Sequence, residues 1–351
     1  MQDDTALLKR MMTDVERQPE LHQFAPYWRP YSNRILKYLK RDGLASFRSN
    51  NGVGKGFSDV LNIDPFFSKH ETNRNMARAW MARFLSKLFP VNKLVTNPFK
   101  ALADAYIARF LFKQSQYLAL RHEDVLSRFV ARYPNVDTLV GNPAITFHFK
   151  DKKIGMTYLH SILTQAFLEQ RCADRVSSMM EIGGGFGANV HLLVETLPNL
   201  RKVIYLDIPP NLYIGTLYLK HFYGEAVVDY ARCEDLCEIR FASDNSLEIF
   251  CIAPWQLKKV ATSLGLFFNA NSFQEMSIPI VESYSAEIHR ISSKDSCMLL
   301  QFYEHTGAEG TIDPRLVVEI FNRFGKFKLA QQPLDVGEGF HMYYSGTESG
   351  A

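Results

Sequence analysis

The stretch Ser178–Gly187, SMMEIGGGFG, determines the fold that the rest of the chain must complete. Its first five residues form a short apolar run typical of a buried strand. Glycines follow at positions 183, 184, 185 and 187, and glycine permits tight turns and close approach of the backbone to a ligand. Apolar residues then recur at the spacing of an amphipathic helix, at Val190, Leu193, Val194 and Leu197. The pattern therefore predicts a strand, a glycine loop and a helix.

Short apolar runs continue to alternate with helical stretches beyond this motif, which predicts an α/β fold with a mostly parallel sheet. The further expected strands are Val203–Leu206, Leu247–Ile252, Leu264–Phe268, Cys297–Phe302, and two closing runs near Phe327–Gln331 and Phe340–Tyr344. Residues 225–246 are more polar and irregular, so we interpret them as an insertion. The result is a seven-stranded sheet with helices on both faces, spanning residues 156–351.

The preceding part, residues 1–155, is predicted to be a mainly helical lobe that caps the site, recognises an acceptor and offers oligomer contacts. Met76, Trp80, Phe84 and Leu88 recur every four residues among basic side chains, and a second helical tract runs from Pro98 to Tyr133. Two interpretations stay open for these helices. In the first, the basic residues form solvated faces of ordinary lobe helices. In the second, they form a surface that attracts an anionic glycolipid or polymer.

The overall composition narrows the class of protein. A net charge of +3 is too mild for a typical nucleic-acid binder, so no nucleic-acid partner is expected. Five irregularly spaced cysteines argue against a disulfide framework and favour a reducing cytoplasm. The N-terminus lacks a signal-peptide pattern, and no apolar stretch approaches the roughly 20 residues that span a bilayer. We therefore expect a cytoplasmic protein, with peripheral membrane contact and homo-oligomer formation left open.

Two acidic residues indicate which class of cofactor the glycine loop binds. On glycines alone, Gly183-x-Gly185-x-x-Ala188 also fits a dinucleotide fingerprint. Glu181, however, would repel a pyrophosphate at the neighbouring helix N-terminus, whereas it suits the α-ammonium of a methionine moiety. Asp207, twenty residues past Gly187, can accept hydrogen bonds from ribose hydroxyls in either class of cofactor. Together they favour S-adenosyl-L-methionine over NAD(P).

Four segments carry a more specific resemblance: EIGGGFG at 181–187, YLDIPPNLYIGTLYL at 205–219, FFNANSFQEM at 267–276 and QFYEH at 301–305. They resemble the sugar O-methyltransferase family within the class I, Rossmann-like methyltransferases. The resemblance covers roughly residues 140–345 and implies methylation of a sugar hydroxyl on a nucleotide-linked sugar, surface glycan or lipopolysaccharide. The alternatives are an NAD(P)-dependent oxidoreductase, a methyltransferase of a non-sugar small molecule, and a degenerate fold that serves as a scaffold.

The resemblance also implies positions for the cofactor. The methionine part would be held by Glu181 and the glycine loop, that is Gly183, Gly184, Gly185 and Gly187. Asp207 would hold the ribose, with Ile208 beside it in the cofactor site, and Ala253, Pro254 and Trp255 would lie beside the adenine. For Trp255, the alternative is a buried tryptophan at the end of a strand. Asn269 and Asn271 should face the cofactor cleft, because ligands bind at the carboxyl ends of strands in open α/β sheets.

A general base would assist the in-line attack of the acceptor hydroxyl. Glu275, after the fourth strand, is the first candidate, and its alternative role is to stabilise the following helix through the helix dipole. His305 is the second candidate because its ordinary pKa is near neutrality. No Asp/His grouping has convincing metal-ligand spacing, so no metal is expected. Acceptor recognition is assigned to the N-terminal lobe, with Trp28, Arg48, Tyr158 and His160 as candidates.

Overall fold

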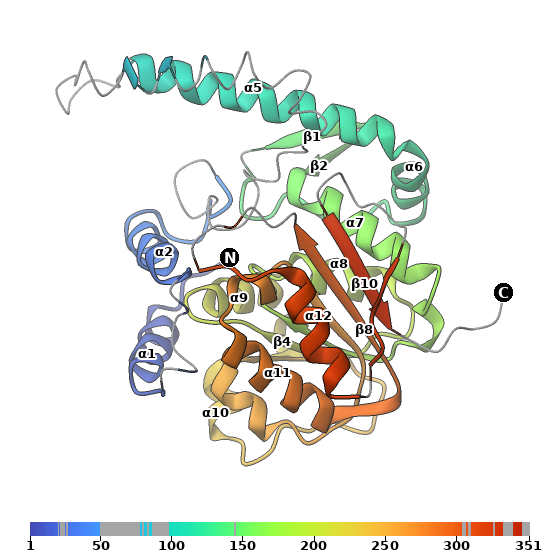
Figure 1. Ribbon diagram of the computed structural model, residues 1–351. Coiled ribbons are helices and arrows are strands. Elements are labelled where there is room, and N and C mark those ends of the chain that lie inside the picture. Colours follow the sequence, from blue (N-terminus) through green and yellow to red (C-terminus); the bar gives the residue numbers. More distant parts are fainter. Residues whose placement is uncertain are drawn as a thin grey trace.

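Eight strands form the central sheet of the computed structural model, in the order β5-β6-β4-β3-β7-β8-β10-β9 (Figure 1). The structure describes residues 1–19, 21, 25, 27–49, 78, 81–82, 84–85, 98–143, 145–303, 307, 310–325, 327–332 and 340–345. The strands are β3 (Ser178–Ile182), β4 (Lys202–Leu206), β5 (Val227–Val228), β6 (Glu248–Ile252), β7 (Leu264–Ala270), β8 (Ser292–Tyr303), β9 (Ala330–Gln332) and β10 (Phe340–Ser345).

The sheet is parallel except at one edge. All the pairings from β5 to β8 are parallel, and β10 runs antiparallel to both β8 and β9. The expected mostly parallel α/β fold is confirmed, with one difference in the strand count. Val227 and Val228 pair with β6, and helix α10 (Tyr230–Asp235) follows them, within the range interpreted as a polar insertion. This two-residue edge strand is too short to produce a periodic sequence signal.

Side chains alternate between two apolar cores because successive residues of a strand point to opposite faces. In β3, Met179 belongs to the first core and Met180 to the second. The first core is covered by helices α7 (Met156–Glu169), α8 (Ala188–Thr196) and α9 (Asn211–Tyr223), and the second by α11 (Ile278–Ile291) and α12 (Pro314–Arg323). Burial on both faces explains why these strands read as continuous apolar runs.

The N-terminal residues contribute α1 (Thr5–Glu16), α2 (Arg29–Asp42), α5 (Pro98–Arg121), α6 (Glu123–Arg132) and the antiparallel pair β1 (Thr146–Phe149) and β2 (Lys152–Gly155). The helical tract expected from Pro98 to Tyr133 is thus two helices, separated at His122. Residues 78, 81, 82, 84 and 85 are helical. Met76, Trp80 and Leu88 of the other expected helix lie outside the described residues.

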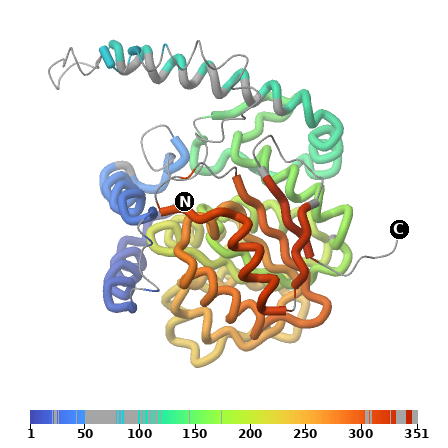
Figure 2. The backbone as a smooth tube through the Cα atoms, in the orientation of Figure 1, coloured from blue at the N-terminus to red at the C-terminus, as the bar shows by residue number. Residues whose placement is uncertain are grey.

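Helix α1 lies against helices that flank the central sheet. The Tyr230 hydroxyl in α10 donates to the Asp14 carboxylate at 2.8 Å, and the Asp4 backbone N–H donates to the Tyr213 hydroxyl in α9 at 2.9 Å. Figure 2 follows the same course, with the blue N-terminal tube beside the body and α5 along its outer edge. Short 3-10 turns complete the structure: η4 (Ala173–Arg175), η5 (Gly224–Ala226), η6 (Pro254–Lys259) and η7 (Phe273–Glu275). None of the helices described is both long and apolar enough to cross a membrane.

Candidate functional site

The glycine loop joins β3 to α8 in a backbone conformation that favours glycine. Gly183, Gly185 and Gly187 have φ values of +70°, +61° and +87°. A Cβ on Gly183 would lie 2.1 Å from the Ser272 hydroxyl oxygen, so there is no space for a side chain at this position. The Tyr205 hydroxyl donates to the Gly185 carbonyl at 2.6 Å and supports the loop from β4. The loop is therefore a narrow backbone surface at the carboxyl end of the central strand.

Glu181 is a buried carboxylate with one open oxygen. The Asn189 side-chain amide donates to its Oε1 at 2.8 Å, whereas its Oε2 has no hydrogen-bond partner among the described residues. Burial raises the pKa of Glu181 to about 8, the Asn189 hydrogen bond opposes that rise, and the charge of Asp207 adds to it. A buried acceptor without a donor is costly. The site is thus suited to a ligand that brings a donor, above all a cationic one.

Asp207 follows β4, whose register places Glu181 opposite Tyr205. One carboxylate oxygen accepts from the Gly185 backbone N–H and the other from the Ile208 backbone N–H, both at 2.7 Å. Burial raises the pKa of Asp207 to about 7, and these two hydrogen bonds oppose the rise. The two carboxylates predicted for the cofactor therefore meet at one edge of the sheet, joined through the glycine loop.

The residues predicted to lie beside an adenine follow β6 at the same edge. Ala253 donates its backbone N–H to the Gln256 side chain at 2.9 Å, which closes the turn through Pro254. Trp255 is buried, and its ring meets that of Tyr230 edge-on, with centroids 6.0 Å apart. The adenine role of this turn stays a prediction.

Asn269 and Asn271 end β7 in different environments. The Asn269 amide is already bonded within the protein, since it donates to the Ile182 carbonyl at 2.7 Å and accepts from the Phe273 backbone N–H at 3.1 Å. It fixes the start of the glycine loop against η7. Asn271 has a φ of +68°, and its buried Oδ1 lacks a partner in the described part of the chain. Of the two, Asn271 therefore has the oxygen that is available to a ligand.

Glu275 lies in η7 at the same edge and is held by two donors from elsewhere in the chain. The Trp28 indole N–H donates to its Oε2 at 2.9 Å, and the Tyr303 hydroxyl donates to its Oε1 at 3.3 Å. Desolvation raises the pKa of Glu275 to about 8, those two donors oppose it, and the charge of Asp207 adds to it. The Glu275 side chain is partly exposed and lies three residues before α11 begins. Its carboxylate oxygens accept from Trp28 and Tyr303.

An aromatic cluster surrounds this carboxylate, and of its members only Trp28 had been singled out from sequence. Tyr27, Trp28 and Tyr31 stand at or just before the start of α2, with ring centroids between 5.4 and 6.0 Å apart. Tyr27 and Tyr31 are four residues apart, the spacing of residues on one helix face, although Tyr27 precedes α2. That spacing was the available signal, but it does not reveal which carboxylate the face meets.

Of the other acceptor candidates, Arg48 and Tyr158 are buried in the interior, and His160 is partly buried. Arg48 donates to the Thr138 and Val140 carbonyls at 2.8 and 3.0 Å, and its guanidinium lies 4.7 Å from the ring centre of Phe186 in the glycine loop. The Tyr158 hydroxyl lies 2.6 Å from His191 Nδ1. Burial lowers the pKa of His160 to about 4. Arg48 thus contacts the glycine loop, and Tyr158 contacts α8, from the interior of the protein. His305 lies outside the described residues.

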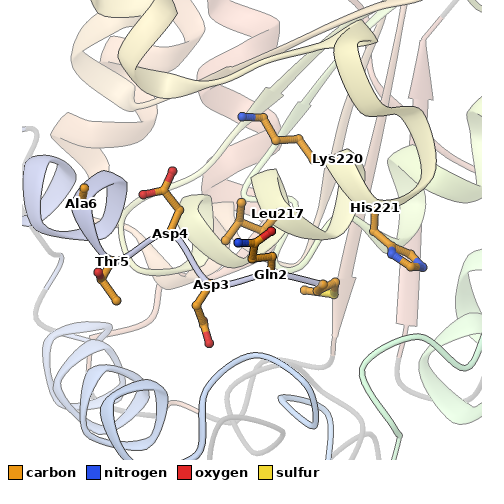
Figure 3. Close-up of a pocket in the computed structure, with 9 residues that line it drawn as sticks. Gln2, Asp3, Asp4, Thr5, Ala6, Leu217, Lys220 and His221 are labelled. Atoms are coloured by element: carbon orange, nitrogen blue, oxygen red, sulfur yellow. The ribbon is translucent and has the colours of Figure 1, made fainter.

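A separate surface pocket lies between the N-terminal residues and α9 (Figure 3). Its volume is about 630 Å³, and its walls are Met1, Gln2, Asp3, Asp4, Thr5, Ala6, Leu217, Lys220 and His221. None of Glu181, Asp207 and Glu275 is among them, so this pocket is distinct from the candidate site.

Comparison with known proteins gives likenesses of fold only. No protein-family model matches the chain, and no curated protein matches it. Among solved structures, the pyocyanin biosynthetic protein PhzM is similar at 12% identity and a TM-score of 0.41, over 83% of this chain and 72% of that one. The N-methyltransferase NodS from Bradyrhizobium japonicum is similar at 12% identity and a TM-score of 0.36, over 53% and 93%.

Magnesium protoporphyrin IX methyltransferase from Synechocystis, with bound S-adenosylmethionine, is similar at 9% identity and a TM-score of 0.36, over 54% of this chain and 77% of that one. All three TM-scores are below 0.5.

Proposed function

We propose that this chain is an S-adenosylmethionine-dependent O-methyltransferase that acts on a sugar hydroxyl of a nucleotide-linked sugar or a surface glycan. One observation carries the cofactor assignment, namely the buried Oε2 of Glu181 with no donor of its own. A cationic α-ammonium group supplies both the missing donor and a compensating charge, and such charge-assisted hydrogen bonds are among the stronger ones. A pyrophosphate at the same loop carries no N–H donor for this oxygen, and its negative charge would oppose ionisation of Glu181.

The residues present fit this cofactor. Glu181 would take the ammonium group, the glycine loop would approach the methionine part, and Asp207 would accept from the ribose hydroxyls. Ala253, Pro254 and Trp255 would border the adenine, and Asn271 would offer its unpartnered oxygen. When bound, S-adenosylmethionine supplies an electrophilic methyl group. Asn269 would act indirectly, because its amide already fixes β7 against the glycine loop.

Glu275 is our candidate for the general base. A base must be ionised to accept a proton, and a pKa of about 8 lets Glu275 exchange protons near physiological pH. Trp28 and Tyr303 hold its two oxygens in place. The acceptor hydroxyl would donate its proton to this carboxylate as the new bond forms. His305 remains the alternative base.

The acceptor would bind beside the aromatic cluster of Tyr27, Trp28 and Tyr31, within the N-terminal residues 1–155 that we assign to acceptor recognition. Flat aromatic faces next to a carboxylate suit a sugar ring, since the faces pack on its C–H surface and the carboxylate accepts from a hydroxyl. Two of the four acceptor candidates, Arg48 and Tyr158, are fully buried supports and are less suited to direct contact.

Thermal unfolding with S-adenosylhomocysteine or NADH tests the cofactor. We expect stabilisation by S-adenosylhomocysteine in the wild type and much less in Glu181→Gln. Stabilisation by NADH alone would favour the oxidoreductase reading and reject the methyltransferase. The acceptor is tested separately, by mass spectrometry of glycans and nucleotide sugars from cells with wild-type protein or Glu275→Gln. The loss of one methyl group from a sugar is the expected result, whereas loss from a non-sugar metabolite would reject the sugar assignment.

A further inference from the structure

The most exposed large apolar side chains gather in one part of the molecule. Of the described residues, Leu120 is 71% exposed, Phe84 61%, Met81 59%, Leu102 47% and Phe112 45%. Every other large apolar residue recorded as exposed lies between 37% and 40%. Exposed apolar side chains that gather in one region mark interaction sites on soluble proteins.

Three of these residues share one stripe of α5, which we call the α5 outer stripe. Its members are exposed and follow one another at intervals of three or four residues: Leu102, Ala105, Arg109, Phe112, Gln116 and Leu120. Residues at that spacing lie on one side of a helix. Arg78 lies over the Tyr106 ring at 5.9 Å, so the helical residues that include Met81 and Phe84 are close to α5. The apolar surface therefore extends beyond a single helix.

The same helix has an excess of positive charge. The sequence of α5 contains four basic residues, Lys100, Arg109, Lys113 and Arg121, and one acidic residue, Asp104. Arg109 belongs to the α5 outer stripe, and Arg78 is exposed on the neighbouring segment. Basic residues beside exposed Leu, Met and Phe suit an anionic membrane surface, because the lipid phosphates attract the cations.

The position of α5 permits such a contact. The helix lies along the outer edge of the molecule, beyond β1 and β2, and its main packing partners are β1 and α6 (Figure 1). The arrow of β8 points toward this side of the molecule (Figure 1), and the candidate site stands at the carboxyl edge of the same sheet. A surface that holds α5 would thus lie on the side toward which the carboxyl end of β8 points (Figure 1).

We propose that the α5 outer stripe docks on an anionic lipid surface. A second copy of this chain is a poorer partner, because pairing the stripe with itself would bring Arg109 and its basic neighbours toward the same charges. A nucleic acid would satisfy the cations, but it would leave Leu102, Phe112 and Leu120 against a polar backbone. An anionic membrane satisfies both parts of the surface: phosphates meet the cations and acyl chains meet the apolar side chains.

Co-sedimentation of the full chain with vesicles tests this proposal. Vesicles of phosphatidylcholine plus phosphatidylglycerol should bind the protein, pure phosphatidylcholine should bind it weakly, and added salt should reduce binding. Arg109→Gln should weaken binding about fivefold at low salt, the effect expected for one cation near such a surface. The triple variant Leu102→Gln, Phe112→Gln and Leu120→Gln should weaken it by more than about tenfold.

A matched triple variant distinguishes vesicle binding through the α5 outer stripe from nonspecific hydrophobic adsorption. Leu236, Leu316 and Phe324 are exposed apolar residues of the catalytic part, at 37%, 40% and 39%, and their replacement by Gln should leave vesicle binding unchanged. Thermal unfolding shows whether each variant folds, and vesicle binding requires no cofactor, so this outcome is independent of the proposed function. Equal losses in the two triple variants would overturn the proposal. Absence of vesicle binding would also overturn it, as would binding of DNA or RNA in preference to vesicles. A wild-type dimer that dissociates in the α5 variant, with no change in vesicle binding, would favour a second copy of the chain and overturn the proposal as well.

Discussion

Trp28 donates its indole N–H to the Glu275 carboxylate at 2.9 Å, across 247 positions of sequence. The donor stands at the start of α2, and the acceptor lies in the turn after β7. The hydrogen bond therefore joins the N-terminal residues to the candidate base at the carboxyl edge of the sheet. It favours the ionised form of Glu275, whereas burial and the charge of Asp207 favour the protonated form.

Trp28→Phe should move the pH dependence of turnover without removing activity. Phenylalanine keeps an aromatic ring but has no donor, so the pKa of Glu275 should rise above its value of about 8. The pH at which kcat reaches half of its maximum should then shift upward, while S-adenosylhomocysteine affinity stays constant. Tyr303→Phe should shift the profile in the same direction, because it removes the second donor. A profile that neither substitution moves would separate Glu275 from the proton transfer.

Glu275→Gln should slow methyl transfer by about 10²–10⁴-fold, the usual contribution of a positioned general base. The amide oxygen can still accept from Trp28 or Tyr303, so folding and cofactor affinity should be retained. In the wild type, kcat should rise with pH as Glu275 ionises near pH 8, and this rise should disappear in the variant. Turnover should be compared with S-adenosylhomocysteine binding on the same samples. Unchanged turnover would move the base assignment to His305.

Cofactor affinity should increase with pH as Glu181 ionises. The free protein holds Glu181 protonated below a pKa of about 8, so a cationic ligand must displace that proton before it can pair with the carboxylate. Affinity for S-adenosylhomocysteine should fall by up to about tenfold for each pH unit below 8. Calorimetry in buffers of different ionisation enthalpy should detect the released proton. Glu181→Gln should lose the slope between pH 7 and 8, while Glu275→Gln keeps it.

The same carboxylate should make the ligand-free protein less stable at alkaline pH. Its pKa is about 8 in the folded chain and near 4.5 in an unfolded one, so the folded state binds the proton more tightly. This contribution to stability is complete below about pH 4.5 and is lost as the pH rises through 8. Glu181→Gln should therefore unfold at a higher temperature than wild type at pH 8, in the absence of ligand. A variant that is less stable at every pH would show that Glu181 serves the fold.

The adjacency of Glu181 and Asp207 was predictable because it follows from local rules. Parallel strands buried on both faces give continuous apolar runs, and β3 was expected and found at Ser178–Ile182. Neighbouring parallel strands end at one edge, so residues at or just after their carboxyl ends meet there. Both acids were therefore assigned to one site from sequence.

The partners of Glu275 could not be predicted in the same way. Whether a tryptophan at the start of α2 reaches the turn after β7 depends on how the N-terminal residues pack on the sheet, and no periodicity encodes that. The same holds for Arg48, whose contact with Phe186 follows from packing between segments far apart in sequence. An apolar or aromatic pattern predicts which face of an element is buried, but it does not predict the partner.

Gly183 allows a sharp test of the cofactor loop, because the chain offers a control that also has a positive φ. Gly183 and Gly224 have φ values of +70° and +50°, so alanine strains the backbone at either position. Only at Gly183 does the new Cβ also meet another residue, the Ser272 side chain at 2.1 Å, whereas nothing lies within 4 Å at Gly224.

Gly183→Ala should therefore lose more stability than Gly224→Ala in urea or thermal unfolding, and it should also lose S-adenosylhomocysteine binding. The Ser272 hydroxyl receives a hydrogen bond from Asn269 at 2.6 Å, so its displacement would disturb the junction of β7 and the glycine loop. Gly224→Ala should keep ligand affinity, since η5 lies beyond α9 and away from the loop. Equal losses in the two variants would mean that backbone strain alone decides both, and that the close packing against Ser272 does not shape the cofactor site.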